Sequence, residues 1–139
     1  GRNVAESLAA NDEFEIVGTY LNSKPWNHAS IKMIRADLTK AEEVNQVIKG
    51  VDIIIQAAAT TSGAKDIVNK PYYHVTDNAL MNSLILRAAY EHSVKQFVFF
   101  SCTVMYPSGD TPLKETDFDA NQEMHKNYFG DYAALIAFA

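Results

Sequence analysis

Apolar and polar positions recur with two different periods along the chain, and they predict short helices and strands in succession. Residues 1–14 have the apolar spacing of a helix that begins at residue 1 or earlier. Residues 15–21 are β-branched and aromatic and predict a strand, which a polar loop separates from a second strand in residues 31–37. The pattern therefore predicts one helix followed by two strands.

The next two segments contain clearer signals for where they begin and end. Residues 38–50 predict a helix with Thr39 as its N-cap, Glu42 as the capping-box partner and Gly50 as the stop. Residues 51–59 form a nearly continuous apolar run, which is typical of a strand covered on both faces. We therefore expect this strand to be buried within a parallel sheet.

A longer helix and a fourth strand complete the pattern. After a polar loop in residues 60–73, residues 76–93 predict a helix whose apolar side chains extend beyond one stripe, so that it should be buried on more than one side. Residues 95–102 predict another strand. Strands that alternate with helices indicate an α/β fold with a mostly parallel sheet and right-handed crossovers.

Length and composition are those of one soluble domain. The chain has 139 residues, of which 47% are hydrophobic and 21% charged. The formal net charge of -5 provides no positive field for phosphate backbones, so we expect no nucleic-acid partner. With one cysteine and no apolar stretch long enough to cross a bilayer, we expect a cytoplasmic protein without a membrane partner.

The carboxyl ends of the predicted strands are where a ligand is expected. In an open parallel sheet the loops diverge there, and the N-termini of the following helices direct free N–H groups inward. Four such ends occur, in residues 19–24, 35–38, 56–63 and 101–107. Candidate binding and catalytic residues are therefore expected in these four segments.

These strand ends, in this order, resemble the extended short-chain dehydrogenase/reductase family of NAD-dependent epimerases and dehydratases. The resemblance covers essentially the whole chain, and residues 57–65, 69–101 and 106–107 are most like GDP-L-fucose synthase and its relatives. It implies a Rossmann-like doubly wound parallel sheet, with residues 1–139 as a single partial NAD(P)-binding domain. The first strand, most of the Gly-rich turn and the C-terminal substrate domain of the family would be missing.

The resemblance also implies cofactor-binding positions. Gly1 looks like the last glycine of the phosphate-binding turn, and Asp37 and Leu38 look like the adenine pocket. The strand end that a dinucleotide approaches would be formed by three small residues, Ala57, Ala58 and Ala59. Two other interpretations stay open: Asp37 could merely cap or precede the next helix, and alanines pack tightly in any parallel sheet.

The end of the second family strand indicates which nicotinamide cofactor is used. An acidic residue there would accept a hydrogen bond from the ribose 2′-OH of NAD, whereas NADP needs cationic or polar groups for its 2′-phosphate. No Asp or Glu lies between Gly18 and Lys24, and Asn22, Ser23 and Lys24 could receive a phosphate. We therefore expect NADP as the cofactor. NAD stays the alternative, because a lysine in a surface loop is usually only solvated.

The family's proton-transfer chemistry implies a tyrosine as acid and base, here Tyr128, with a lysine four residues later that lowers its pKa. That position is Tyr132. Either the family lysine lies in residues outside this sequence, or residues 130–139 do not continue the family pattern, or the Tyr/Lys pair is altered. The family's hydroxyl position is occupied by Cys102, which Ser101 and Thr103 flank. All three are candidates to contact the substrate oxygen, and Cys102 could equally be a small buried hydrophobe.

The resemblance implies an NAD(P)-dependent nucleotide-sugar epimerase or reductase similar to GDP-L-fucose synthase. The alternative is a non-catalytic dinucleotide-binding protein of the same family, acting as a sensor or scaffold, which the absent lysine favours. The helix over residues 78–90 corresponds to one that family members use in a dimer, so a homodimer is expected. The four histidines lack the spacing of metal ligands, and we expect no metal.

Overall fold

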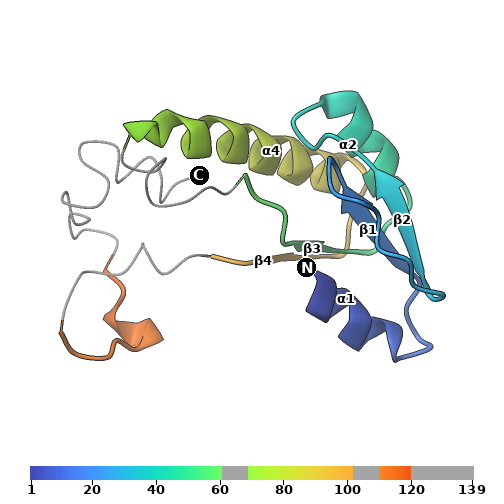
Figure 1. Ribbon diagram of the computed structural model, residues 1–139, viewed down its shortest axis with the longest axis horizontal. Coiled ribbons are helices and arrows are strands. Elements are labelled where there is room, and N and C mark those ends of the chain that lie inside the picture. The colour runs from blue at the N-terminus through green and yellow to red at the C-terminus, as the bar shows by residue number, and fades with distance from the viewer. Residues whose placement is uncertain (61–68, 102–109, 120–139) are drawn as a thin grey trace. The chain divides into compact units, whose positions relative to one another are not determined.

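The computed structural model describes residues 1–60, 69–101 and 110–119. The elements within these ranges follow the predicted order of helix, strand, strand, helix, strand, helix and strand (Figure 1). In chain order they are α1 (Arg2–Ala9), β1 (Ile16–Tyr20), β2 (Ile31–Arg35), α2 (Ala41–Ile48), β3 (Ile53–Gln56), α4 (Pro71–Glu91), β4 (Gln96–Phe99) and a 3-10 helix (Glu115–Asp117).

β1 and β2 form a parallel pair of strands. Ile16 lies opposite Ile31, and the register continues to the ends of both strands. Gly18 lies opposite Met33, and a Cβ atom added to this glycine would be only 2.6 Å from the Met33 Sδ atom. The absence of a side chain at Gly18 therefore allows the methionine to lie across the neighbouring strand.

Helix α2 begins later than predicted and has a different cap. Lys40 is the N-cap residue and makes no side-chain capping bond, so the assignment of Thr39 as N-cap was wrong. Thr39 instead donates its backbone N–H and its hydroxyl to Asp37 Oδ1, at 3.1 and 2.6 Å. An Asp two residues upstream forms such a local turn readily, and it occupies the hydroxyl that would have capped the helix. Glu43, rather than Glu42, reaches back and accepts a 2.7 Å bond from the Asp37 N–H.

The C-terminal end of α2 follows the prediction. The helix ends before Gly50, which has a φ of +79°, a left-handed conformation that suits glycine. Val44 and Ile48 on its inner face are buried. The other buried apolar residues of the described chain lie on β2, directly after it, or on α4, namely Ile31, Ala36, Met81, Ile85, Ala88 and Ala89.

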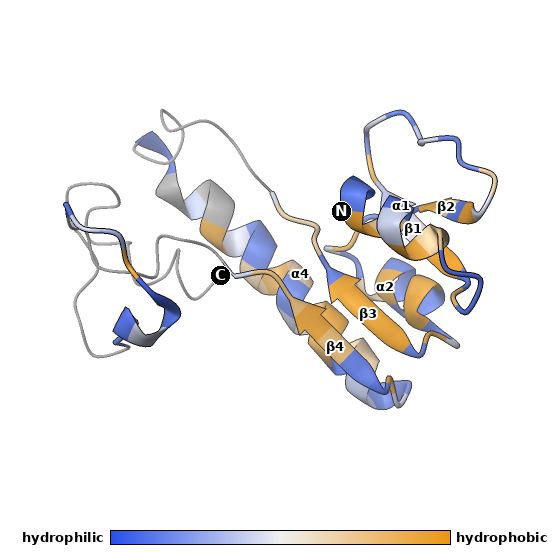
Figure 2. Ribbon diagram, turned by 90° about the horizontal axis from the view of Figure 1, so that it is seen from below, coloured by the Kyte–Doolittle hydropathy of each residue, from blue (hydrophilic) through white to orange (hydrophobic). Residues whose placement is uncertain are grey.

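β3 and β4 form a second two-stranded sheet rather than joining β1 and β2 in one sheet (Figure 2). The expectation that residues 51–59 are covered on both faces was wrong for the described chain. Ile53 is 41% exposed, and Phe99 on β4 is 52% exposed. Side chains project from the faces of a sheet, so these values show that part of a face on each strand is left uncovered by the described residues.

Helix α4 is longer than predicted and less buried. It begins at Pro71, five positions before the expected start, and proline suits a first helical turn because its missing N–H has no partner there. Leu86 is 53% and Tyr90 88% exposed, although the sequence pattern predicted a helix that is buried on more than one side. Only one side of the described helix is covered.

The chain divides into two compact units. One contains residues 1–58 and 83–98, and the other contains residues 59–82 and 99–139. In the second unit, the acidic residues of the 3-10 helix are exposed, and Asp117 Oδ2 accepts a 2.7 Å bond from the Lys114 N–H. Among the helices of the described residues, none is long and apolar enough to cross a membrane.

Candidate functional site

The first turn of α1 lies beside the carboxyl end of β3. A Cβ atom placed on Gly1 would be 3.8 Å from the Ala57 Cβ, so two of the predicted cofactor positions lie next to each other. Gly1 is the N-cap of α1 and makes no side-chain capping bond, and Ala57 and Ala58 are exposed. Free N–H groups at a helix start, next to a strand end without large side chains, can accept a phosphate group. The residues therefore fit the diphosphate of a dinucleotide.

Gln56 fixes the backbone at this strand end, a role that the sequence reasoning missed. Its side chain is 5% exposed. Its Oε1 accepts a bond from the Ala58 N–H at 3.3 Å, and its Nε2 donates to the Ala58 carbonyl at 3.2 Å. The only signal in the sequence is one amide at the end of an apolar run. A residue with this pair of bonds holds the exposed alanine in a defined position.

Asn78 holds the next part of the loop in the same way and was also missed as a functional residue. Its Oδ1 accepts a 2.8 Å bond from the Thr60 N–H, and its Nδ2 donates to the Thr60 carbonyl at 3.1 Å. The two residues are 18 positions apart, so spacing along the chain does not reveal the contact. Both polar backbone groups of Thr60 are thereby tied to helix α4.

The loop after β1 contains the residues proposed to select the cofactor. Asn22, Ser23 and Lys24 begin one residue after the end of β1 and are exposed. Further along this loop, the Trp26 ring lies under the guanidinium of Arg2, whose Cζ is 4.8 Å from the ring centroid. The structure thus brings a cation from α1 to the loop where the sequence predicts phosphate binding.

Asp37 has a local electrostatic role. The bonds from the Thr39 hydroxyl and backbone N–H, aided by Lys40, lower the pKa of Asp37 below its ordinary value of 3.8. Lys40 Nζ lies 3.7 Å from Asp37 and 3.4 Å from Glu43, and the pKa of Glu43 is lowered chiefly by the bond from the Asp37 N–H. Of the two interpretations of Asp37, the structural one has direct contacts, and adenine binding by Asp37 and Leu38 stays a prediction.

The predicted proton-transfer residues lie mostly outside the described residues. Ser101 is described and follows β4 at an exposed position. Cys102, Thr103 and Tyr128 fall outside the described ranges, so their roles stay predictions. Within residues 1–60, 69–101 and 110–119, no group of three or more His, Cys, Asp or Glu side chains could hold a metal ion.

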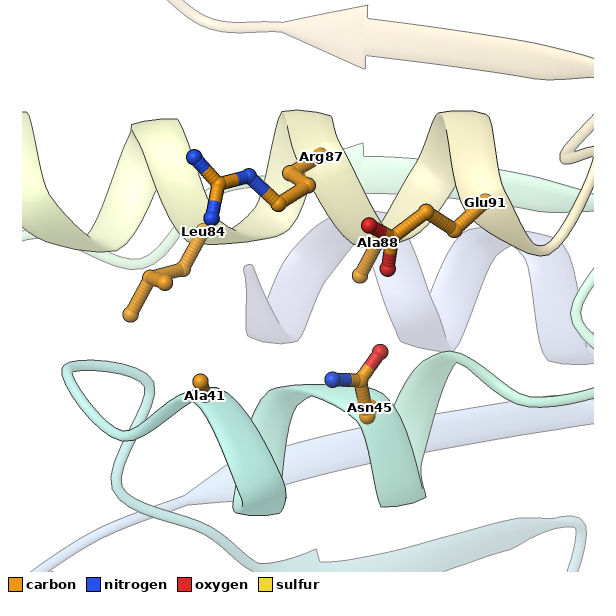
Figure 3. A pocket seen from close by; sticks show the side chains of 6 residues that line it. All are labelled: Ala41, Asn45, Leu84, Arg87, Ala88 and Glu91. Atoms are coloured by element: carbon orange, nitrogen blue, oxygen red, sulfur yellow. The ribbon is translucent and has the colours of Figure 1, made fainter.

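A cavity of about 180 Å³ lies between α2 and α4, away from the strand ends (Figure 3). Next to it, His92 Nε2 is 3.2 Å from Asn45 Oδ1, which links the end of α4 to α2. The lining combines small and apolar residues with two charged groups of opposite sign and consists of Ala41, Asn45, Leu84, Arg87, Ala88 and Glu91. This hollow contains none of the predicted site residues.

Comparison with known proteins decides the family. The model of the NAD dependent epimerase/dehydratase family matches residues 1–134. The chain belongs to this family. No curated protein matches the chain.

Solved structures share the fold at low sequence identity. A mutated uronate dehydrogenase matches with a TM-score of 0.70 and 18% identity, over 99% of this chain and 46% of its own. The Bordetella bronchiseptica enzyme WbmH in complex with NAD+ matches with a TM-score of 0.68 and 20% identity, again over 99% and 46%. MlghC, a GDP-mannoheptose C4 reductase from Campylobacter jejuni with NADP bound, matches with a TM-score of 0.62 and 20% identity, over 78% and 36%.

These matches confirm the predicted α/β, Rossmann-like fold. That residues 1–139 form a single domain stays a prediction. The chain spans less than half of the length of these solved structures. At such identities the likeness establishes the fold, and the particular resemblance to GDP-L-fucose synthase stays a prediction.

Proposed function

We propose that the full-length protein is an NAD(P)-dependent nucleotide-sugar epimerase or reductase, similar in activity to GDP-L-fucose synthase. The observation that supports it most is the closeness of Gly1 to Ala57, where a helix start without a side-chain cap lies beside a strand end of small, exposed residues. Such a place accepts the diphosphate of a dinucleotide. Family membership over residues 1–134 supports the same class of enzyme.

The proposed substrate is a GDP-linked keto sugar. Two structural neighbours have titles that name GDP sugars, the GDP-mannoheptose C4 reductase and a GDP-6-OMe-4-keto-L-xylo-heptose reductase from C. jejuni. Their identities to this chain are only 20%, so the support comes from their agreement with the GDP-L-fucose synthase resemblance. A turnover assay with different nucleotide-linked keto sugars tests the identity of the substrate.

In the proposed reaction, the bound nicotinamide supplies or takes up the hydride at a sugar carbon. Tyr128 exchanges the proton with the oxygen on that carbon, and a hydroxyl or thiol from Ser101, Cys102 or Thr103 holds the same oxygen in place. The chain has Tyr132 where the family lysine would stand, so that position does not supply the cation that the family places beside its tyrosine.

The proposed cofactor is NADP. Asn22, Ser23 and Lys24 provide polar and cationic groups at the end of β1, where no carboxylate stands. A cationic group there favours a 2′-phosphate, whereas a carboxylate would favour the free ribose hydroxyl. The solved neighbours contain NAD+ in one case and NADP in another, so family membership alone does not choose between them.

The test is to incubate the full-length protein with NADPH and a GDP-4-keto-6-deoxy sugar, and to follow NADPH oxidation together with the sugar product. Turnover that disappears in Tyr128→Phe supports the proposal. Cofactor binding without turnover on a panel of GDP-, UDP- and dTDP-linked keto sugars would contradict it and favour the sensor or scaffold alternative. This alternative is supported by Tyr132, which occupies the position of the family lysine.

We also propose that the protein is a cytoplasmic homodimer that pairs through residues 78–90 of α4. Leu80, Leu86 and Tyr90 are exposed on this helix, and a second copy of the same helix would cover them. The single cysteine fits a reducing compartment. Sedimentation of the full-length protein and cell fractionation test these two statements separately.

A further inference from the structure

The cavity between α2 and α4 has one charge of each sign among its lining side chains. Ala41 and Asn45 line it from α2, and the last two turns of α4 contribute the other residues (Figure 3). All of them belong to the same compact unit. The volume of about 180 Å³ is below the roughly 300–1,000 Å³ of pockets that hold drug-sized ligands. The cavity therefore fits a molecule of a few heavy atoms and is too small for a nucleotide sugar.

Arg87 and Glu91 are both exposed and both available to a ligand. They lie four positions apart on α4, where opposite charges can form an ion pair, but a cation on the N-terminal side is the less favourable order. Among the described residues, neither side chain has an ion-pair or hydrogen-bond partner. In Figure 3 both side chains bend back along α4, the guanidinium over Leu84 and the carboxylate over Ala88. The two charges therefore lie one helical turn apart beside the cavity.

Asn45 adds a hydrogen-bond donor from the opposite helix. Its Oδ1 lies 3.2 Å from His92 Nε2 and accepts a bond when that nitrogen carries the proton. The Nδ2 of the same amide can then donate to a ligand. Asn45 is half-buried, and the bond to His92 holds its amide in place. This donor is therefore oriented before a ligand binds, which lowers the entropic cost of binding.

The start of α2 favours negative charge at the end of the cavity near Ala41. Lys40, the N-cap residue, makes no side-chain capping bond, so the positive end of the helix dipole is left uncapped there. Two carboxylates lie in the first turn: Glu43 is 3.4 Å from Lys40 Nζ, and Glu42 offsets part of the dipole. The Arg87 guanidinium adds a full positive charge from α4. This end of the cavity is therefore suited to the anionic group of a ligand.

We propose that this cavity binds a small zwitterion with the chemistry of a free amino acid. The Arg87 guanidinium and Asn45 Nδ2 donate hydrogen bonds to the carboxylate of the ligand, and its ammonium group pairs with the Glu91 carboxylate. The small side chains of Ala41 and Ala88 leave the space that the ligand occupies. A ligand with only one of the two charges leaves either the cation or the anion of the site unpaired and binds more weakly. The cavity is separate from the strand ends, so the inference does not depend on the proposed function.

The test is a ligand-observed NMR titration of the full-length protein with L-alanine, propionate and ethylamine. Propionate is L-alanine without its ammonium group, and ethylamine is L-alanine without its carboxylate. L-Alanine should bind with a dissociation constant on the order of 1 mM, because exposed charge pairs each contribute little. Each of the two analogues with a single charge should bind about fivefold more weakly or less.

Variants of the lining residues test the roles of charge and space. Arg87→Gln and Glu91→Gln should each weaken L-alanine binding by about three- to tenfold, since each removes one charged partner. Ala41→Leu should weaken it by more than about tenfold, because a larger side chain at this exposed position fills the cavity. Lys49→Gln removes an exposed charge just after α2 that does not line the cavity. It is the matched control and should bind L-alanine as the wild type does.

Circular dichroism checks that each variant folds, and NADPH affinity is measured on the same samples. The inference is overturned if L-alanine shows no saturable binding up to about 50 mM, or if propionate or ethylamine binds as tightly as L-alanine. Unchanged L-alanine affinity in Arg87→Gln or in Glu91→Gln overturns it too. The proposed function stands in each of these cases when NADPH still binds. A wild type that binds L-alanine and not NADPH overturns the proposed function and supports this inference.

Discussion

Replacing Gln56 by methionine removes both hydrogen bonds that fix Ala58 while keeping the length and shape of the side chain. Gln56 is the polar residue among the buried side chains of the described chain, at 5% exposure, and its amide bonds both polar backbone groups of Ala58. A methionine fills the same volume with an apolar thioether. The change therefore tests the hydrogen bonds and leaves packing nearly intact.

The expected cost follows from these two bonds. An intramolecular hydrogen bond contributes about 0.5–1.5 kcal/mol net, so Gln56→Met should lower the free energy of unfolding by about 1–3 kcal/mol. Ala58 is exposed, so water can satisfy its N–H and C=O in part, and a value near the lower end is expected. If the dinucleotide needs the ordered strand end, each kcal/mol of lost order weakens its binding by about fivefold.

Urea unfolding and NADPH titration of the full-length protein measure these two quantities. Gln46→Met is the matched control, because Gln46 is exposed on α2 and its replacement should change neither. If Gln56→Met has the midpoint and the NADPH affinity of the wild type, the reasoning that this amide fixes the strand end is refuted. A loss of stability with unchanged affinity would restrict the role of Gln56 to folding.

Three further predictions concern packing, charge and assembly. Gly18→Ala should change the free energy of unfolding by less than about 1 kcal/mol in thermal unfolding, because the new Cβ would lie 2.6 Å from the Met33 Sδ, near the end of a flexible side chain that can rotate away; a larger loss would contradict this. Because the pKa of Asp37 is lowered from 3.8 on folding, its stabilising effect is complete above that pH and disappears as the pH falls through the folded value. Asp37→Asn should therefore flatten the acid limb of the stability profile, and an unchanged limb would contradict this. Leu86→Glu should shift the full-length protein from dimer to monomer in sedimentation, whereas a dimer that persists in this variant and in Tyr90→Glu would exclude the proposed face.

The order of elements could be predicted because apolar periodicity records which face of each segment is buried. The ends of the elements were harder, since they depend on competition between local hydrogen bonds. Thr39 has the residue type of an N-cap, yet its hydroxyl bonds Asp37 at 2.6 Å, and the cap passes to Lys40. The start of α4 was missed because its first turns, from Pro71 on, are polar and aromatic and have no apolar spacing.

Burial was overestimated for the same physical reason in β3 and α4. An apolar sequence shows that a side chain would gain by leaving water, but it does not show that another element lies over it. Ile53 and Leu86 are both apolar and both more than 40% exposed, because the described elements cover only one side of each segment. The sequence therefore showed which side chains of β3 and α4 are apolar, but not which of them another element covers.

The candidate site depends on a combination that residue types alone could not reveal. Exposed alanines at the end of β3 leave the backbone open to a ligand, but alanine side chains make few contacts that would hold that backbone in place. Gln56 and Asn78 compensate by bonding the N–H and the C=O of Ala58 and of Thr60. Open access and a fixed backbone are therefore supplied by different residues, so the proposed binding of a dinucleotide here would not have to order these backbone groups at the moment of binding.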